Sequence, residues 1–564
     1  MSNLAKVRSI VKSPALRAVF KWSRPVHRQI LLLSILGVVT SLLSLAVPLV
    51  TRGLIDSATS PEQRIETLWL YGSLLVAVVG AARLLTVLTS RIRINTSVRL
   101  QMEMQRMVTD SLMIKDYASI KPYHSGDLVN RIFSDVGVVK GGVISLLPSI
   151  LQTAVSFVGA AIILLMMDWR FLPLLLLAGA VGLVISILFR NPMKRRHKRM
   201  QEAEGALHAS TQENLENIRT VKASMSEERA LRQMEAYREN LADEQMRNGR
   251  LSIWMNQGMG VLFEASWLIC YLWGCARIFH HEFTYGSLAA LIQLVGRIQG
   301  PISSAVGLVS QAYGVVSSAE RLMEVVDLPD DVEGIALSSF DEIRLEHVSF
   351  QYRDGTEDVL LDVNATIRSG DSVALTGQSG GGKTSLFQLL LAIYRPTSGR
   401  VLFVSGDTVC TASRSTRGLF AYVPQGNTLF SGTLRDNLTM FADSVTEERL
   451  QSAIEAACLE DLVREIGLDA RLGERGLGLS EGQAQRVAVA RALLSDAPIL
   501  LLDEATAALD ERTEVRMLRN IAALPGKTLI IVTHRRAALA ICGKRFHIAD
   551  GHMTPVDVLT DTDI

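Results

Sequence analysis

The chain has 564 residues, of which 48% are hydrophobic, and its mean hydropathy is +0.24. A chain of this length is too long for a single domain with one hydrophobic core. The mean hydropathy is high for a soluble enzyme but low for a protein made only of membrane spans. Lys and Arg number 58 and Asp and Glu number 57, so the net charge of +1 gives no indication of a nucleic-acid partner. These averages fit a membrane half joined to a soluble half.

The first segment, residues 1–28, is basic and precedes the first long apolar run. Its positive charges are spread along the segment, and no small-residue cleavage site comes before the apolar run, so a cleaved signal peptide is not expected. We predict a cytoplasmic amphipathic segment at 1–28 that lies on the inner face of the membrane.

Six apolar runs follow, each long enough to cross a bilayer core about 30 Å thick. They lie at about 29–50, 67–90, 146–167, 171–189, 252–276 and 286–308. The segments after the second and fourth runs are long and rich in Lys and Arg, whereas the other connecting segments are short. By the positive-inside rule the N-terminus is cytoplasmic, and six crossings return the chain to that side. We predict a transmembrane domain over 29–325 with long cytoplasmic helical extensions.

The sequence pattern changes after the last apolar run. Residues 326–340 include a proline, a glycine and several acidic residues without helical periodicity, which predicts a linker. Over 341–564, short β-rich runs alternate with helical segments, a pattern typical of an α/β domain with a largely parallel sheet.

A glycine-rich loop lies early in this α/β region. Its residues match G-x-x-x-x-G-K-[ST] and are Gly377, Gln378, Ser379, Gly380, Gly381, Gly382, Lys383 and Thr384. The loop lies between an apolar strand and a helix, as a P-loop requires, because backbone N–H groups and the helix N-terminus then bind phosphate oxygens. We expect Lys383 to reach the β and γ phosphates of ATP, Thr384 to supply a hydroxyl to Mg²⁺, and Ser385 to join the nucleotide site.

The expected fold class is an all-α six-helix transmembrane domain followed by an α/β P-loop nucleotide-binding domain.

An acidic pair ends the apolar run ILLLDE at 499–504. This run predicts a buried strand whose end presents two carboxylates. We expect Asp503 to bind the magnesium ion and Glu504 to polarise a water molecule against the γ phosphate.

Residues 479–493, LSEGQAQRVAVARAL, resemble the signature segment of ATP-binding cassette (ABC) proteins, whose usual pentapeptide is L-S-G-G-Q. Other motifs follow in that family's order, and the resemblance implies a role for each. Tyr352 resembles the adenine-stacking aromatic, Gln425 the Q-loop glutamine near Mg²⁺ and the hydrolytic centre, Asp510 the D-loop aspartate, and His534 the switch histidine. In the membrane half, the segments 124–136 and 317–326 are similar to segments of exporters of that family.

In this family the signature loop of one subunit completes the nucleotide site on the P-loop of the other. The resemblance therefore implies that Ser480, Gly482 and Gln483 contact ATP held by a second chain, either a second copy or a related half-transporter. Glu481 departs from the family pattern, because glycine is usual there. Its carboxylate either weakens ATP-driven closure by repulsion or points away, and we expect a working hydrolytic site.

Two charged residues lie deep in the predicted spans. Glu264 in the fifth span and Arg297 in the sixth are each about 17 Å from the outer span ends at 1.5 Å per residue, near the middle of the bilayer core. A charge at this depth is costly and therefore points to function. Either Glu264 and Arg297 line the cargo pathway, or they form a structural ion pair between packed helices.

The motifs together predict ATP-driven export by a dimeric ABC transporter in a lipid bilayer, with ATP and Mg²⁺ as cofactors. Two alternatives stay open, namely a membrane-bound ATPase that acts as a sensor or regulator, and one half of a heterodimeric exporter. The fused order of spans and nucleotide-binding domain disfavours an importer. The expected location is a bacterial-type inner or plasma membrane, with the N-terminus and the nucleotide-binding domain in the cytoplasm. Small-molecule, peptide and lipid cargoes all fit the sequence.

Overall fold

The computed structural model describes residues 13–60, 64–353, 355, 357–442, 444–473, 476 and 478–556. The chain forms two structural units. The first comprises Met1–Asp110 and Ser125–Val326, and the second comprises Ser111–His124 and Asp327–Ile564. Residues 1–12 of the predicted N-terminal segment lie outside the described residues.

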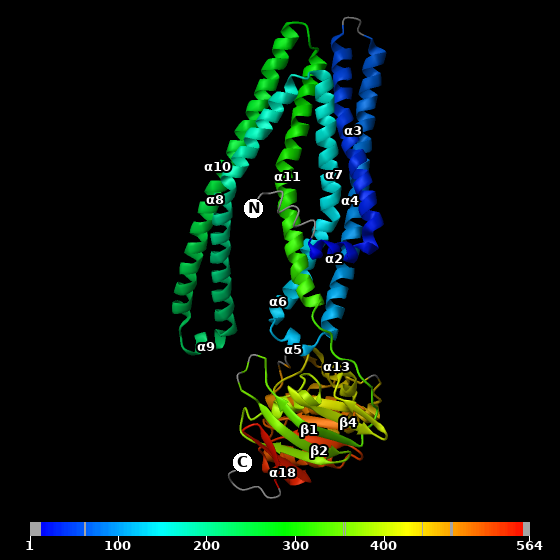
Figure 1. Ribbon diagram of the computed structural model, residues 1–564, viewed down its shortest axis with the longest axis vertical. Coiled ribbons are helices and arrows are strands. Elements are labelled where there is room, and N and C mark those ends of the chain that lie inside the picture. Colours follow the sequence, from blue (N-terminus) through cyan, green and yellow to red (C-terminus); the bar gives the residue numbers. More distant parts are fainter. Residues whose placement is uncertain are drawn as a thin grey trace. The chain divides into compact units, whose positions relative to one another are not determined.

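Long helices build the first unit (Figure 1). They are α2 (Pro14–Trp22), α3 (His27–Thr59), α4 (Ile65–Ile114), α6 (Ser125–Asn130), α7 (Val136–Met167), α8 (Phe171–Glu216), α9 (Ile218–Ala223), α10 (Glu227–Phe279) and α11 (Tyr285–Val326), with short turns η1 (Arg24–Val26) and η2 (Arg131–Asp135). The six predicted spans fall within α3, α4, α7, α8, α10 and α11.

Four helical segments of the described residues are long and apolar enough to cross a membrane. They are Arg24–Thr59, Ile65–Ile114, Ser125–Met167 and Glu227–Phe279. The two other predicted spans lie in α8 and α11, which are 46 and 42 residues long. At 1.5 Å per residue, each of these helices is long enough to span the bilayer core and continue beyond it.

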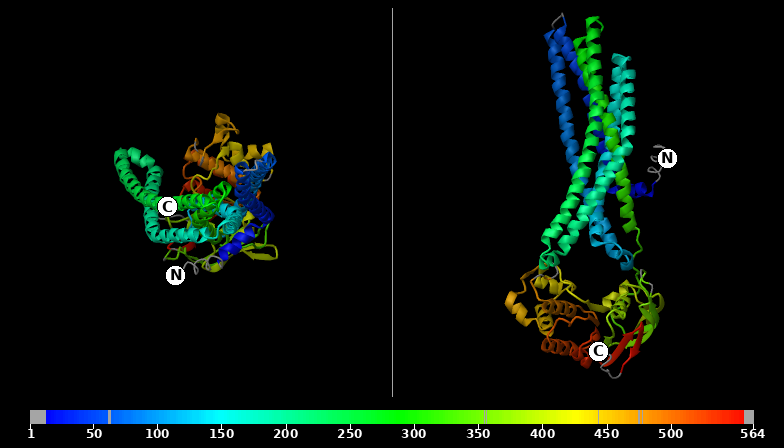
Figure 2. Two further views of the ribbon diagram at one scale, coloured as in Figure 1. Left: turned by 90° about the horizontal axis from the view of Figure 1, so that it is seen from above. Right: turned by 90° about the vertical axis from the view of Figure 1, so that its left-hand side faces the viewer.

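The helices of the first unit pack in two groups. Helices α3, α7 and α11 contact one another, whereas α8 and α10 lie side by side and are joined through α9 (Figures 1 and 2). Ion pairs join η2 to the end of α11: Arg131 Nη1 lies 3.0 Å from Glu324 Oε2, and Arg321 Nε lies 3.0 Å from Asp135 Oδ2. The two membrane-half segments that resemble exporter segments are therefore in direct contact.

The second unit contains the strands. They are β1 (Glu342–Phe350), β2 (Leu360–Arg368), β3 (Ser372–Thr376), β4 (Ser398–Ser405), β5 (Thr408–Thr411), β6 (Phe420–Val423), β7 (Gly432–Thr433), β8 (Arg471–Leu472), β9 (Ile499–Asp503), β10 (Thr528–Val532), β11 (Lys544–Ala549) and β12 (His552–Pro555). Its helices are α5 (Tyr117–Ile120), α12 (Lys383–Leu390), α13 (Leu434–Thr439), α14 (Glu447–Ala456), α15 (Glu460–Ile466), α16 (Glu481–Leu493), α17 (Glu511–Ala522) and α18 (Arg536–Ile541), with the turn η3 (Arg414–Leu419).

Two sheets organise this unit. One has the strand order β2-β1-β4-β5 and is antiparallel, and the other has the order β12-β11-β3-β10-β9-β6. In the second sheet β11, β3, β10, β9 and β6 are parallel, and β12 pairs antiparallel with β11. The predicted fold class, a helical transmembrane domain followed by an α/β domain, is confirmed.

The parallel sheet lies between two hydrophobic cores, because successive strand residues point to opposite faces. Leu500 and Leu502 of β9 belong to a core shared with α14, α16 and α17. Ile499 and Leu501 of the same strand belong to a second core, which is shared with α12 and the antiparallel sheet. Because these strands are parallel, their carboxyl ends lie along one edge of the sheet.

Candidate nucleotide-binding site

Four of the parallel strands, β3, β6, β9 and β10, carry predicted site residues at the same edge of the sheet. In the register of the strands, Leu375 of β3 is opposite Val532 of β10, and Val532 is opposite Asp503 of β9. The residues that follow these strands include the P-loop after β3, Glu504 after β9, Gln425 after β6 and His534 after β10. Ligands of parallel α/β sheets bind at such carboxyl edges, so the topology brings the predicted catalytic residues together.

The P-loop has a backbone that only glycine tolerates at its two ends. The φ angle of Gly377 is +137°, and a Cβ added there would lie 2.1 Å from the carbonyl oxygen of Ile548. The φ angle of Gly382 is +99°, and its Cβ would lie 2.8 Å from the carbonyl oxygen of Val359. The loop therefore turns directly into α12, whose free N–H groups point out of the helix start and suit an anion.

Lys383 is the first residue of α12 and is only 5% exposed. Its Nζ donates to the carbonyl oxygens of Gly377 at 2.5 Å and Gln378 at 2.8 Å. Burial lowers the pKa of Lys383, and the nearby carboxylates of Glu504 and Asp503 oppose this shift. These hydrogen bonds hold the Lys383 amine on the backbone of the P-loop.

Asp503 ends β9 and is 1% exposed. Thr384 Oγ1 donates to its Oδ1 at 3.4 Å, and the hydroxyl of Tyr422 donates to its Oδ2 at 3.5 Å. Burial raises the pKa of Asp503, while the Thr384 hydrogen bond acts in the opposite direction. A buried carboxylate beside a threonine hydroxyl is an oxygen donor set that suits a hard divalent cation.

Glu504 leaves the strand with a left-handed backbone, since its φ angle is +50°. Left-handed φ values are unusual for residues other than glycine and cluster at functional sites. Gln425 Nε2 donates to Glu504 Oε2 at 2.7 Å, so the predicted Q-loop glutamine holds the predicted catalytic carboxylate. Burial lowers the pKa of the half-buried His534, as does the charge of Lys383, and Glu504 opposes both effects.

Tyr352, the predicted adenine-stacking residue, contacts α12. Its hydroxyl lies 2.8 Å from Ser385 Oγ and donates to Gln388 Oε1 at 3.1 Å. The Nζ atom of Lys121 lies 4.8 Å from the centre of the Tyr352 ring, and Tyr394 packs edge-on at 5.3 Å. Lys121 and Tyr394 were not predicted, because neither belongs to a motif.

The predicted signature residues form the start of α16. Ser480 Oγ accepts from the N–H of Gln483 at 3.2 Å, and Gln483 Oε1 accepts from the N–H of Ser480 at 2.8 Å. This reciprocal pair is a capping box, which explains why serine and glutamine stand three residues apart. Glu481 is exposed in the first turn, and Asp510 caps α17 by accepting from the N–H of Thr513 at 3.0 Å. In the described part of the chain, no hydrogen bond or ion pair joins Ser480–Gln483 to the P-loop.

The predicted pathway residues lie in the first unit. Both Glu264 on α10 and Arg297 on α11 are exposed, and no ion pair joins them in the described part of the chain. The two helices are instead linked by Gln299, whose Nε2 donates to the carbonyl oxygen of Phe263 at 3.2 Å.

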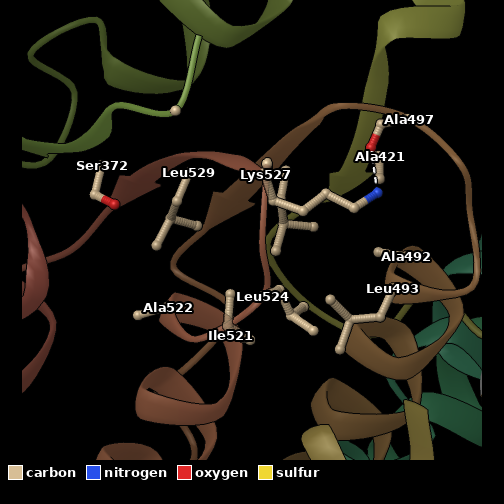
Figure 3. Close-up of a pocket in the computed structure, with 13 residues that line it drawn as sticks. Ser372, Ala421, Ala492, Leu493, Ala497, Ile521, Ala522, Leu524, Lys527 and Leu529 are labelled. Carbon is tan, nitrogen blue, oxygen red and sulfur yellow. Dashed lines mark hydrogen bonds between the residues drawn. The ribbon is translucent and has the colours of Figure 1, made fainter. Parts of the chain in front are cut away.

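A separate cavity of about 150 Å³ lies in the second unit, where β3, β9 and β10 meet α16 and α17. Lys527 donates to the carbonyl oxygen of Ala497 at 2.6 Å (Figure 3). It also donates to the carbonyl oxygen of Ser495 at 3.2 Å. Burial lowers the pKa of Lys527. The other lining side chains are mostly apolar, and no predicted site residue lines this cavity. It is therefore distinct from the nucleotide edge.

Comparisons with known proteins match both halves. Residues 30–302 match the ABC transporter transmembrane region, and residues 360–507 match the ABC transporter family. A probable multidrug resistance ABC transporter ATP-binding/permease protein of Bacillus subtilis is 28% identical over 74% of this chain and 72% of its own length. An ATP-dependent lipid A-core flippase of Desulfotalea psychrophila is 28% identical over 74% of each chain.

A bacterial Atm1-family ABC exporter solved with ATP bound shares this fold. Its TM-score is 0.78 over 94% of each chain, at 22% sequence identity. The two matched regions follow one another in the order in which the structure shows the helical unit and the α/β unit. The chain therefore belongs to the ABC transporter family, with the transmembrane and nucleotide-binding regions fused in one polypeptide.

Proposed function

We propose that the chain is a half-transporter that works as a dimer and couples ATP binding and hydrolysis to the export of a cargo. The observation that carries this proposal is the division of the nucleotide machinery within one chain. The P-loop, Asp503, Glu504, Gln425 and His534 lie at one edge of the sheet, whereas among the described residues the signature cap at Ser480 makes no polar contact with that P-loop. A second chain would supply the missing half of each site.

We assign the groups at the carboxyl edge to binding and hydrolysis. Lys383 and the N–H groups of the P-loop bind the β and γ phosphates, and the ring of Tyr352 stacks on the adenine. Glu504 orients the attacking water and accepts its proton, Gln425 holds Glu504 in place, and His534 contacts the γ phosphate as a neutral donor.

Mg²⁺ fits the donor set at this edge. Asp503 and Thr384 would hold the ion, with Gln425 beside them. When bound, Mg²⁺ neutralises charge on the β and γ phosphates.

For the signature half, we assign Ser480, the N–H of Gly482 and Gln483 to the γ phosphate of ATP on the partner's P-loop, and Asp510 to the same interface. Closure of two such ATP-filled interfaces would move the cytoplasmic helical extensions together, and hydrolysis would release them. We further propose a homodimer in a bacterial-type inner or plasma membrane, with the N-terminus and the nucleotide-binding domain in the cytoplasm. The proposed boundaries are 29–325 for the transmembrane domain, 326–340 for the linker and 341–564 for the nucleotide-binding domain.

The cargo pathway is proposed to include Glu264 and Arg297. Both side chains are exposed in the single chain, and no ion pair joins them among the described residues. This favours a role in the pathway over a fixed structural ion pair. The relatives named for multidrug resistance and for lipid A-core flipping suggest amphipathic cargo. In Glu264→Gln and Arg297→Gln variants, cargo-stimulated ATP hydrolysis should fall more than basal hydrolysis. Equal losses in both activities would contradict the pathway assignment.

The purified dimer in lipid vesicles tests the main proposal. ATP hydrolysis is measured across a chemically diverse cargo panel, together with ATP-dependent accumulation in inverted vesicles, and Glu504→Gln is the inactive control. Accumulation that requires ATP and Glu504 supports export, and hydrolysis without accumulation of any compound favours a sensor. Cross-linking of the chain expressed alone tests the homodimer, because a monomer would favour pairing with a related half-transporter.

A further inference from the structure

Arg535 binds two backbone carbonyls of the loop that follows Glu504. Arg535 Nη2 donates to the carbonyl oxygen of Ala507 at 2.6 Å, and Nη1 donates to that of Leu509 at 2.7 Å. One guanidinium thus binds carbonyls on both sides of Ala508. Hydrogen bonds from a charged donor are stronger than neutral ones, so the loop 505–510 is firmly placed.

Arg535 lies three residues after the end of β10, at the N-cap of α18, and is itself held by hydrogen bonds. It directly follows His534, its N–H donates to Thr533 Oγ1 at 3.0 Å, and its Nη1 lies 2.9 Å from Glu514 Oε2. Glu514 lies on α17 and is 1% exposed. The group that anchors the loop is therefore adjacent in the chain to His534.

The opposite side of the same loop contacts the signature helix. The N–H of Ala508 donates to Gln485 Oε1 at 3.1 Å, and Gln485 on α16 is 5% exposed. A Cβ added to Gly482 would lie 2.8 Å from the carbonyl oxygen of Ala508, so the helix start packs directly on the loop. The Ser480 cap is the N-terminal end of this helix.

We infer that Arg535 is a positioning residue that couples each chain's switch histidine, through the loop 505–510, to the signature cap of the same chain. This inference rests on the proposed dimer, in which that cap closes over ATP on the partner's P-loop. Arg535 therefore acts on the nucleotide of the other chain. If Arg535 only neutralised the buried carboxylate of Glu514, its substitution would not affect ATP on the partner chain more than ATP on its own chain.

Mixed dimers of full-length chains separate the two roles. One chain carries Lys383→Ala, so that it binds no ATP, and the other carries Glu504→Gln, so that bound ATP is retained. Arg535→Lys is placed either in the Lys383→Ala chain, where its cap faces the bound ATP, or in the Glu504→Gln chain, where it does not. Lysine keeps a positive charge beside Glu514 but cannot donate to both carbonyls in the geometry of guanidinium. Labelled ATP retained after rapid gel filtration is measured.

Arg535→Lys in the Lys383→Ala chain should shorten ATP retention about tenfold, the factor expected from one lost charged hydrogen bond. In the Glu504→Gln chain the same change should have a smaller effect. Gln485→Leu in the Lys383→Ala chain should reproduce the larger effect. It removes the hydrogen bond from the N–H of Ala508 on the other side of the loop and leaves the Arg535–Glu514 pair intact.

The matched control is Arg417→Lys in the Lys383→Ala chain. Arg417 likewise donates to two carbonyls, those of Leu391 and Ala392, and pairs with Asp331, but it lies outside this network. Equal effects of Arg535→Lys in the two positions, or an Arg417→Lys effect of the same size, would overturn the inference while leaving the dimer intact. If the parent mixed dimer retains no ATP, the composite site of the proposed function fails, and the inference fails with it.

Discussion

The P-loop edge and the signature face belong to the same α/β unit but differ in how their functional groups are held. Lys383 and Asp503 are almost fully buried and are bonded to neighbours within the chain. Ser480 and Glu481 are exposed at a capped helix start. The edge is thus preorganised by the fold, whereas the face is open to solvent in the single chain, as the proposed contact with a second chain requires.

The largest expected effect separates chemistry from binding at the edge. Glu504→Gln should lower ATP hydrolysis by at least about 100-fold, because a positioned general base contributes that much or more. ATP binding should persist, since the amide can still accept the hydrogen bond from Gln425. Phosphate release and equilibrium ATP binding are compared, with Lys383→Ala as the variant that loses binding. Hydrolysis within a few-fold of the parent would contradict the assignment of Glu504.

The second effect tests the steric basis of the preorganised edge. Gly377→Ala should weaken ATP binding at least tenfold, because its Cβ would lie 2.1 Å from a backbone oxygen and the loop must shift. Gly380→Ala is the matched control. Its φ angle is also positive at +83°, but among the described residues no atom beyond its chain neighbours would lie within 4 Å of an added Cβ. Similar losses in the two variants would mean that backbone conformation, rather than close packing, limits the loop.

The third effect concerns pH. Because burial and Lys383 hold the pKa of His534 below its ordinary value, the ring stays neutral at pH 7. Titration of His534 should therefore leave hydrolysis unchanged between pH 8 and about 6.5, and hydrolysis should fall as the ring is protonated at lower pH. The kcat of the parent and of His534→Ala are followed over this range. A His534-dependent fall that begins above pH 7 would contradict a neutral switch histidine.

The smallest expected effect lies on the exposed face. If Glu481 repels the partner's ATP, Glu481→Gly in a Glu504→Gln background should prolong ATP retention by about twofold to fivefold, the range of a solvent-exposed charge interaction. High salt should reduce the gain. Glu481→Gln separates the charge from the backbone change. Retention that is unchanged at low salt in both variants would show that the carboxylate points away from the nucleotide.

In the membrane unit, the positions of the spans and the packing of their side chains depend on different features of the chain. Hydropathy placed all six spans within long helices, because a bilayer imposes a minimum apolar length that is visible in one dimension. Hydropathy does not predict whether the side chains of Glu264 and Arg297 form an ion pair. Their depth in the bilayer follows from residue counting, but their facing directions depend on how α10 and α11 pack, and no ion pair forms between the described side chains.

The amino-acid sequence predicted the order of the two units, the P-loop, the acidic end of β9, and the candidate residues Gln425 and His534. These features are local: strand ends, helix caps and glycine conformations depend on residues close together in the chain. Only the tertiary structure placed Lys121 over Tyr352, Gln425 on Glu504, and Arg535 and Gln485 on opposite sides of the loop 505–510. Those contacts join residues that are distant in the sequence. They depend on how the sheet packs on both faces, because this packing sets where the strand ends and the helices meet.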